Sequence, residues 1–326
     1  MGTGMNSPDD LLYVPSDGSI LVGEHGDGHL SRITAPGVLA RLPQVIPLAE
    51  GLAQIGDTLY VADQLHNRIV KLTATGVATV LQLTPDPSGN NLDGISSDLK
   101  GSGLVIPDSP HGTVLFVDAA GHITGRVGGF SRPAGVFPDP QYAGYLVADE
   151  NASAVYEIVG GRPKRLAGGL SGVDDAVREQ NGHVIAILPA AGRLVDVTTG
   201  VNIATKLNNP QGLGFDGAGN LLVAESGSGR VDMVVRTFTV EVPAPAVQLV
   251  PGQAVCLGIL RAPGYTDGVA IQESIGATYD PAPSTADRIE VVPGPCGTPP
   301  CTVNIAFRSP SGQADAPQYV AFTYRD

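Results

Sequence analysis

The sequence predicts an all-β protein, a six-bladed β-propeller followed by a small C-terminal β-sandwich. The main observation is a repeat, because the stretch LYVADQLHNRIVKL at residues 59–72 returns in five further variants. The residue that ends the first strand of each copy serves as a marker, and the six markers are Glu24, Asp63, Asp108, Asp149, Leu188 and Glu225. They are 39, 45, 41, 39 and 37 residues apart. A period of about 40 residues with only strand-like patterning is typical of four-stranded propeller blades.

Composition supports the same fold class. The chain has 43 glycines and 27 prolines among its 326 residues, and only 16% of its residues are charged. Such a composition suits many short strands that are joined by tight turns. No long amphipathic helical pattern appears, and no apolar run approaches the roughly 20 residues that cross a bilayer. We therefore expect a protein without a membrane span.

The innermost strand of each blade can be placed from the repeat. These strands are LLYV (11–14), GLAQI (51–55), GISSD (94–98), AGVFPD (134–139), DAVRE (175–179) and QGLGFD (211–216). The sixth blade is irregular, because the run VDMVVRTFTVEV at 231–242 contains no turn residue. Either the chain reverses near Arg236–Thr237, or one long strand leaves the propeller and the ring closes in another way.

The pattern changes after residue 242. Strand-like runs such as AVCLGIL (254–260) and TVNIAF (302–307) follow at irregular spacing, and Pro/Gly-rich turns separate them. These runs share no repeat with the preceding residues and predict a small sandwich of two antiparallel sheets. The predicted domains are therefore a propeller over 1–242 and an immunoglobulin-like β-sandwich over 243–326.

The charge of the chain limits its partners. The formal net charge is −13, from 32 acidic and 19 basic residues. A chain of this charge repels phosphate backbones, so we expect no nucleic-acid partner. Cations or a basic partner surface fit better.

Three cysteines, Cys256, Cys296 and Cys301, all lie in the C-terminal region. The segment CGTPPC lacks the ligand count and the spacing of a zinc knuckle. We predict a disulfide between Cys296 and Cys301, with Cys256 free and buried in a strand; three unpaired thiols in a cytosolic protein are the alternative. The disulfide favours an exported protein, extracellular or periplasmic, whose leader has been removed.

The repeat resembles a known family. GDTLYVADQLHNRIVKL (56–72) and PQGLGFDGAGNLLVAESGSGRV (210–231) closely resemble the NHL repeat, and the likeness covers roughly residues 8–240. The six-bladed architecture is similar to the senescence-marker/gluconolactonase group and to the lyase domain that cleaves peptidyl-hydroxyglycine. The lactonase resemblance implies a central divalent cation held by Glu, Asn and Asp, but its leading Glu-Gly-Pro is matched only by Glu50-Gly51-Leu52. The zinc-binding histidines of the lyase have no counterparts here.

One candidate site is formed by the residue at the start of each innermost strand or directly before it. This inner ring consists of Asp10, Glu50, Asp93, Ala134, Asp174 and Gln211. Carboxylates held close together repel one another unless a cation or protons neutralise them. Oxygen ligands favour Ca²⁺ or Mg²⁺ over zinc. The four acids therefore predict a divalent cation, with Gln211 as a ligand-binding neighbour; a water-filled acidic mouth without metal is the alternative.

The six markers form a second candidate ring. Asp63 and Glu225 each have an arginine five residues later, Arg68 and Arg230, so a structural ion pair across the turn is expected for both. Asp108 and Asp149 lack such a partner and are candidates for ligand binding.

Three histidines, His25, His66 and His111, fall in connections on the same face. They could serve as general bases or ligand contacts, or they could be ordinary exposed loop residues.

Two functional classes remain. The first is an exported binding module that recognises a small molecule or a protein on its acidic loop face. The second is a metal-dependent hydrolase or lyase of the lactonase type, in which the cation polarises a carbonyl and activates water. The first is favoured, because most lactonase features of the sequence are missing.

Overall fold

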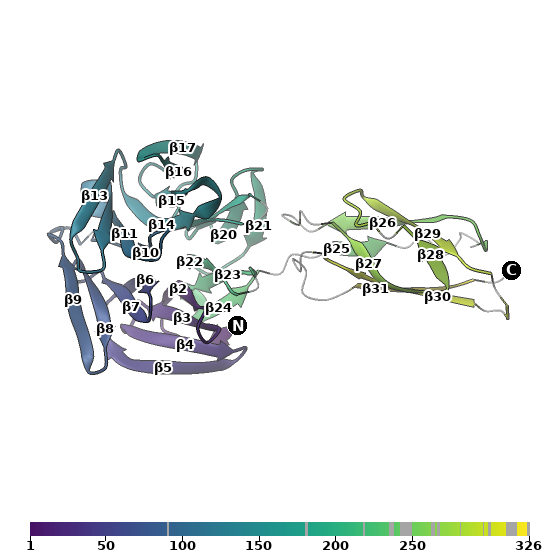
Figure 1. The fold of residues 1–326 in the computed structure, drawn as a ribbon, viewed down its shortest axis with the longest axis horizontal. Helices are drawn as coiled ribbons and strands as arrows, with labels where there is room; N and C mark the ends of the chain where they lie inside the picture. The colour runs from purple at the N-terminus through teal and green to yellow at the C-terminus, as the bar shows by residue number, and fades with distance from the viewer. Residues whose placement is uncertain are drawn as a thin grey trace. The chain divides into compact units, whose positions relative to one another are not determined.

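The structure is a computed structural model of the 326-residue chain, which divides into a first unit, Met1–Val234, and a second unit, Val235–Asp326 (Figure 1). It describes residues 1–89, 91–179, 182–217, 219–234, 238–241, 250–261, 265, 268–280, 282–295, 297–298, 301–310 and 318–324. The predicted domain boundary at 242/243 and Cys296 lie outside the described residues.

Within the described residues, the first unit contains six four-stranded antiparallel sheets. The first three are β2 (Pro8–Val14), β3 (Ser19–Glu24), β4 (His29–Ala35) and β5 (Val38–Val45); β6 (Ala49–Ile55), β7 (Thr58–Asp63), β8 (Arg68–Thr73) and β9 (Gly76–Gln82); and β10 (Ser96–Ser97), β11 (Gly103–Asp108), β12 (Thr113–Asp118) and β13 (Ile123–Gly128). The next two are β14 (Pro133–Asp139), β15 (Gly144–Asp149), β16 (Ala154–Val159) and β17 (Arg162–Gly168); and β18 (Ala176–Arg178), β19 (Val184–Leu188), β20 (Arg193–Asp196) and β21 (Val201–Thr205). Short 3₁₀ turns follow β11, β14 and β23 at Ser109–His111, Pro140–Tyr142 and Ser226–Ser228. In Figure 1 the first strands, such as β2, β6, β10 and β14, lie towards the middle of the unit, and β5, β9 and β17 lie at its periphery.

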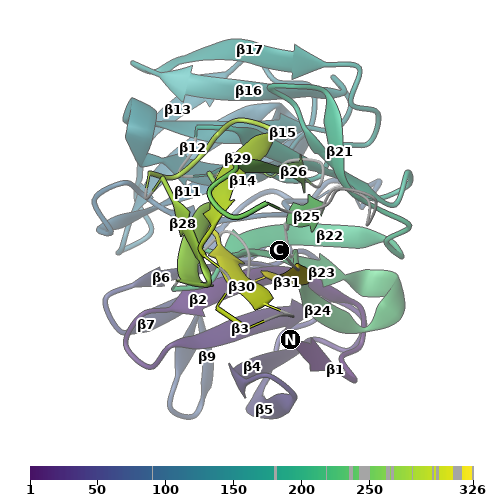
Figure 2. The ribbon, with the colours of Figure 1, turned by 90° about the vertical axis from the view of Figure 1, so that its right-hand side faces the viewer.

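The sixth sheet joins the two ends of the unit. It consists of β22 (Pro210–Phe215), β23 (Leu221–Glu225), β24 (Arg230–Met233) and, as its outer strand, β1 (Gly2–Thr3). Gly2 pairs with Val231 and Thr3 with Arg230, and β1 and β24 lie beside each other in Figure 2. The N-terminus therefore supplies the outer strand of this sheet. Arg236–Thr237, where a reversal of the chain was one of the two alternatives, lie outside the described residues.

Apolar clusters connect each of these sheets to the next. Val14, Leu21 and Leu30 of the first sheet pack with Leu52 and Val61 of the second. Corresponding clusters join the second sheet to the third, the third to the fourth, the fourth to the fifth and the fifth to the sixth. A sixth cluster joins the last sheet to the first. The six sheets of the first unit thus form a closed cycle in which every sheet buries both faces against its neighbours.

The first strands approach one another so closely that some positions admit only glycine. A Cβ atom on Gly51 would lie 2.2 Å from the backbone nitrogen of Ile95 in the next sheet, and one on Gly212 would lie 2.3 Å from the carbonyl oxygen of Asp9. This close approach places the residue before each of these positions at a narrow central opening.

The second unit contains two further sheets within its described residues. One consists of β25 (Phe238–Glu241), β26 (Val255–Arg261), β29 (Arg288–Pro293) and β28 (Ala277–Tyr279); the other of β27 (Ala270–Ile275), β30 (Cys301–Arg308) and β31 (Gln318–Tyr324). One apolar cluster draws on both, for example Leu257 and Val291 from the first and Val303 and Phe307 from the second. None of the helices in the described part of the chain is long and apolar enough to cross a membrane.

The cysteines differ from the expectation in one respect. Cys301 is disulfide-bonded and Cys256 is free, but Cys256 is exposed rather than buried. The reason is strand alternation, because Val255 and Leu257 on either side of Cys256 point into the apolar cluster.

We expect Gly51→Ala to destabilise the first unit by about 1–3 kcal/mol, because the added methyl group meets the backbone of the next sheet. Gly125→Ala is the matched control, since its Cβ would lie 3.6 Å from the nearest atom, in the Phe116 side chain. Urea unfolding measures both. Equal stability of the two variants would contradict the close approach of the first strands.

Alkylation of the native protein without reductant should label Cys256 and leave Cys301 unlabelled. After unfolding and reduction both should be labelled, and peptide mass analysis distinguishes the two patterns. Label at Cys301 in the native, unreduced protein would show that its disulfide does not form.

Candidate functional site

Two chambers lie along the central opening of the first unit. The outer chamber has a volume of 560 Å³ and the inner chamber one of 160 Å³. Five side chains line both chambers: Asp9, Glu50, Asp93, Asp174 and Gln211. We call these five residues the cavity ring. Three of the four predicted metal-ligating acids and the predicted Gln211 belong to it.

Asp10 differs from the other predicted members of the ring, because the first sheet is shifted by one residue relative to the prediction. Pro8 pairs with Glu24 as Ala49 pairs with Asp63, so Asp9 and not Asp10 is the counterpart of Glu50. The sequence Asp9-Asp10-Leu11-Leu12 offers two equally polar and two equally apolar positions, which leaves the register ambiguous. Asp9 therefore occupies the ring position that the sequence suggested for Asp10.

Asp10 holds two sheets together. Its Oδ1 accepts a hydrogen bond from the backbone N–H of Leu11 at 2.7 Å, and its Oδ2 accepts one from Leu52 of the next sheet at 2.7 Å. Asp175 repeats the arrangement with Ala176 and Leu213. Burial is the main cause that raises the pKa of both acids, to about 6 for Asp175. Because both acids accept backbone N–H groups from two sheets, we interpret the role of Asp10 and Asp175 as structural.

Asp9, Glu50 and His25 form one connected group. The carboxyl groups of Asp9 and Glu50 are hydrogen-bonded to each other, and His25 Nε2 lies 3.1 Å from Glu50 Oε1. Burial, followed by the charge of Asp9, raises the pKa of Glu50 well above its ordinary value. The raised pKa favours the protonated form of Glu50, whose hydroxyl can donate a hydrogen bond to Asp9.

Asp93 is neutralised by a cation from another sheet. Arg132 Nη2 lies 2.8 Å from Asp93 Oδ2, and Gln64 Nε2 donates a hydrogen bond to Asp93 Oδ1 at 2.6 Å. Arg132 also forms an ion pair with Glu150. Burial nevertheless raises the pKa of Asp93 to about 6, although Arg132 and Gln64 oppose this shift.

Asp174 has no such partner. Its carboxylate lines both chambers and makes no hydrogen bond or ion pair with another described residue. Burial, followed by the charges of Asp9 and Asp93, raises its pKa well above the ordinary value. Gln211 lies in the cavity ring as predicted and adds an amide to the chamber wall.

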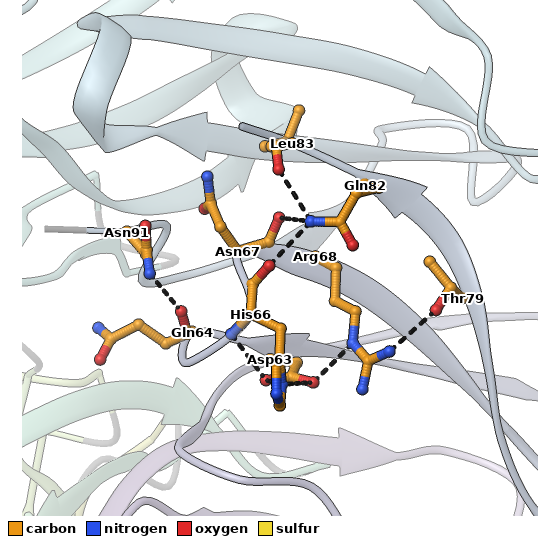
Figure 3. Close-up of polar contacts among 9 residues, drawn as sticks. All are labelled: Asp63, Gln64, His66, Asn67, Arg68, Thr79, Gln82, Leu83 and Asn91. Carbon is orange, nitrogen blue, oxygen red and sulfur yellow. Dashed lines mark hydrogen bonds and ion pairs between the residues drawn. The ribbon is translucent and has the colours of Figure 1, made fainter. Parts of the chain in front are cut away.

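The markers themselves are buried and hold loops. Asp63 lies between His66 and Arg68, whose Nδ1 and Nε atoms are 2.9 Å and 2.7 Å from its carboxylate oxygens (Figure 3). Glu225 accepts hydrogen bonds from Arg230 and from the backbone N–H of Asn208. Both acids thus have the structural ion pair that the sequence suggested.

Asp149 and Asp108 have partners that the sequence did not reveal. Asp149 accepts hydrogen bonds from the backbone N–H groups of Ser131, Arg132 and Ala152, which fixes the loop before β14. Asp108 pairs with His111, whose Nδ1 lies 2.8 Å from its Oδ1. Both carboxylates are buried and neither lines the two chambers. A direct role of Asp108 or Asp149 in ligand binding therefore has no support in the geometry.

Of the three predicted histidines, only His25 lines the outer chamber. His66 and His111 pair with Asp63 and Asp108 across their own turns, and both side chains are about half exposed. They lie outside both chambers, as expected of ordinary loop residues.

In five of the six repeats the residue that follows the marker faces the outer chamber; the exception is Ser109, which donates a hydrogen bond to the carbonyl of Pro133. His25, Gln64, Glu150, Pro189 and Ser226 all line it. Strand alternation explains this, since the marker turns into the sheet packing and the next residue turns away from it. The same period-two rule, applied to the repeat, would have found Gln64 and Glu150 from the sequence.

The cavity ring does not fit a preformed metal site. Among the residues that the structure describes, no three His, Cys, Asp or Glu side chains are placed so that they could hold a metal ion. Calcium requires six to eight oxygen ligands. Here Arg132 and Gln64 occupy Asp93, and Glu50 is engaged by Asp9 and His25. The predicted Ca²⁺ or Mg²⁺ therefore stays a prediction that the geometry does not favour.

Solved structures with the same fold carry different activities. The chain is similar to virginiamycin B lyase from Staphylococcus aureus, with a TM-score of 0.53 and 13% identity over 98% of this chain and 96% of that one. Regucalcin from Agrobacterium tumefaciens, a calcium-binding protein, matches with a TM-score of 0.55 and 16% identity over 72% of this chain and 94% of that one. A nidogen/laminin complex matches with a TM-score of 0.54 and 16% identity over 67% and 85% of the two chains.

These likenesses, together with that to a putative gluconolactonase, confirm that the chain contains a β-propeller. Identities this low show the fold alone. No protein-family model matches the chain, and no curated protein matches it in sequence.

The raised pKa values predict a pH-dependent stability. The folded state keeps the proton of Asp93 up to a pH of about 6, whereas the unfolded chain releases it near 3.8. The free energy of unfolding should therefore fall as the pH rises from about 4 to 6. Asp93→Asn should make this slope shallower, by up to about 1.4 kcal/mol per pH unit.

Urea unfolding at pH 4, 5, 6 and 7 measures the slope. Asp57→Asn removes an acid in an exposed turn and serves as the control, with the slope of the wild type. A slope in Asp93→Asn that equals that of the wild type would contradict the raised pKa of Asp93.

Proposed function

We propose that the chain is an exported binding module, which recognises a small molecule or a protein with the outer chamber and the acidic loop face around it. The observation that carries the proposal is the arrangement of the cavity ring. Arg132, Gln64 and His25 already engage the carboxylates that a catalytic metal would need. A site of this kind offers charge and hydrogen bonds to a ligand, and the carboxylates that a metal would need are engaged by protein groups.

The finer architecture belongs to the same proposal. We interpret the six sheets of the first unit as the six blades of an NHL-type propeller, with β1 completing the last blade. The two sheets that share an apolar cluster in the second unit are interpreted as the immunoglobulin-like sandwich predicted for 243–326. The disulfide at Cys301 supports export to the periplasm or the extracellular space, since disulfides persist in oxidising compartments.

A protein partner has one parallel among the similar structures, the nidogen/laminin complex. A metal-dependent lactonase is the second candidate function, and its support is the likeness to regucalcin and to a putative gluconolactonase. The two candidates differ in one measurable requirement, which is the divalent cation.

Chelation should leave the melting temperature within about 1 °C of the untreated protein, because the cavity ring is neutralised by its own residues. A bound ion present at about 100 times its dissociation constant would instead add roughly 2.7 kcal/mol. Differential scanning calorimetry with EDTA, and then with added Ca²⁺ or Mg²⁺, measures the difference.

Lactone hydrolysis should likewise stay at the buffer rate with Ca²⁺, Mg²⁺, Mn²⁺ or Zn²⁺ present. Glu50→Gln is the comparison, since it removes a central carboxyl group with little change in shape. Metal-stimulated turnover that Glu50→Gln abolishes would establish the lactonase and overturn the binding module.

A further inference from the structure

Asp174 differs from every other acid of the cavity ring in its surroundings. Asp9 and Glu50 share a hydrogen bond, and Asp93 has Arg132 and Gln64. The side chain of Asp174 is partly buried and lines both chambers, and it has no hydrogen-bond or ion-pair partner among the described residues. A partly buried carboxylate without a partner is neutralised either by a proton or by a cation, so a cation that enters the outer chamber can pair with it.

The chamber wall on the side of Asp174 is small and neutral. Gly172, Pro189 and Ala190 belong to the same repeat as Asp174 and line the outer chamber, and none of them carries a charge. Asn209 and Gln211 from the next sheet add amide groups to the same chamber. The other titratable and charged residues of the outer chamber belong to the first four repeats: Asp9, His25, Glu50, Asp93, Arg132 and Glu150. The part of the chamber wall that contains Asp174 therefore has space for a ligand, and it also offers hydrogen-bond acceptors.

We propose that the outer chamber binds an organic cation, a primary ammonium group or a basic side chain of a partner, whose charge pairs with Asp174. The proposal rests on the binding function argued above and names the chemistry of the ligand. An ammonium group has three donors and can be satisfied by one carboxylate and two amide oxygens. Such a set is present in Asp174, Asn209 and Gln211.

A divalent metal is a poorer occupant of this position. Ca²⁺ needs more oxygen ligands than a single free carboxylate and two amides provide, and Mg²⁺ needs near-octahedral geometry. No described set of three acids or histidines meets that requirement here. The guanidinium of Arg132, which pairs with Asp93, shows within the same cavity how an organic cation is held by one of these acids.

Benzylammonium and benzyl alcohol test the proposal, because they are similar in shape and differ in charge. Ligand-observed saturation-transfer NMR with the full chain, at millimolar probe, should detect benzylammonium and not benzyl alcohol. Asp174→Asn should weaken benzylammonium binding at least about tenfold, since a charge-assisted hydrogen bond is lost. Asp57→Asn, which removes the same charge from an exposed turn, should leave it unchanged.

Arg132→Gln provides a second variant whose effect has the opposite sign. It leaves Asp93 without its cation, so the cavity becomes more negative and benzylammonium should bind several-fold more tightly. Equal binding of the two probes, full affinity in Asp174→Asn, or no binding of benzylammonium to the wild type would each overturn the proposal. The melting temperature of every variant is measured alongside, so that a folding defect is recognised.

The outcome is separable from the broader function. Metal-stimulated lactone hydrolysis would overturn the binding module itself. Absence of both hydrolysis and benzylammonium binding would reject only the organic cation as the ligand.

Discussion

The close approach of the six first strands around the central opening is the constraint on which the candidate site depends. The backbones meet so tightly that Gly51 and Gly212 have no room for a side chain. The same approach brings the preceding side chains to one partly buried ring along the central opening. Carboxylates at such positions raise one another's pKa and resist ionisation. The fold therefore brings several carboxylates close together at its centre, and their negative charges have to be neutralised or hydrogen-bonded by other groups.

Three kinds of local interaction stabilise these carboxylates. Asp10 and Asp175 accept backbone N–H groups from two sheets each. Asp9 and Glu50 share a hydrogen bond, and Asp93 pairs with Arg132. A central metal ion could also neutralise these carboxylates. It competes with the ion pair between Arg132 and Asp93, however, because the arginine occupies a carboxylate that the metal would need as a ligand. Asp174 is the one acid of the cavity ring that has no hydrogen-bond or ion-pair partner among the described residues.

The repeat made the propeller predictable, since strand alternation and turn spacing are local properties of the sequence. The members of the cavity ring were largely predictable for the same reason, and the error at Asp10 arose where two acids and two leucines leave the register open. The partners were not predictable. Arg132 and Asp93 are 39 positions apart in the sequence, and only the packing of neighbouring sheets brings them together. Closure by Gly2–Thr3 was missed because two residues carry no periodic signal.

Strand alternation also separates the residues that hold the loops from those that face a ligand. Glu24, Asp149 and Glu225 each accept the backbone N–H of the residue two positions before the first proline of their sheet: Asn6, Ser131 and Asn208. The second sheet begins with Ala49 instead of a proline, and the residue two positions before it is Pro47, which has no N–H, so Asp63 binds His66 and Arg68 instead. Because the markers fix the loops, the residues that follow them can change without loss of the fold. That freedom gives a physical reason why one propeller architecture serves a lyase, a calcium-binding protein and a nidogen/laminin complex.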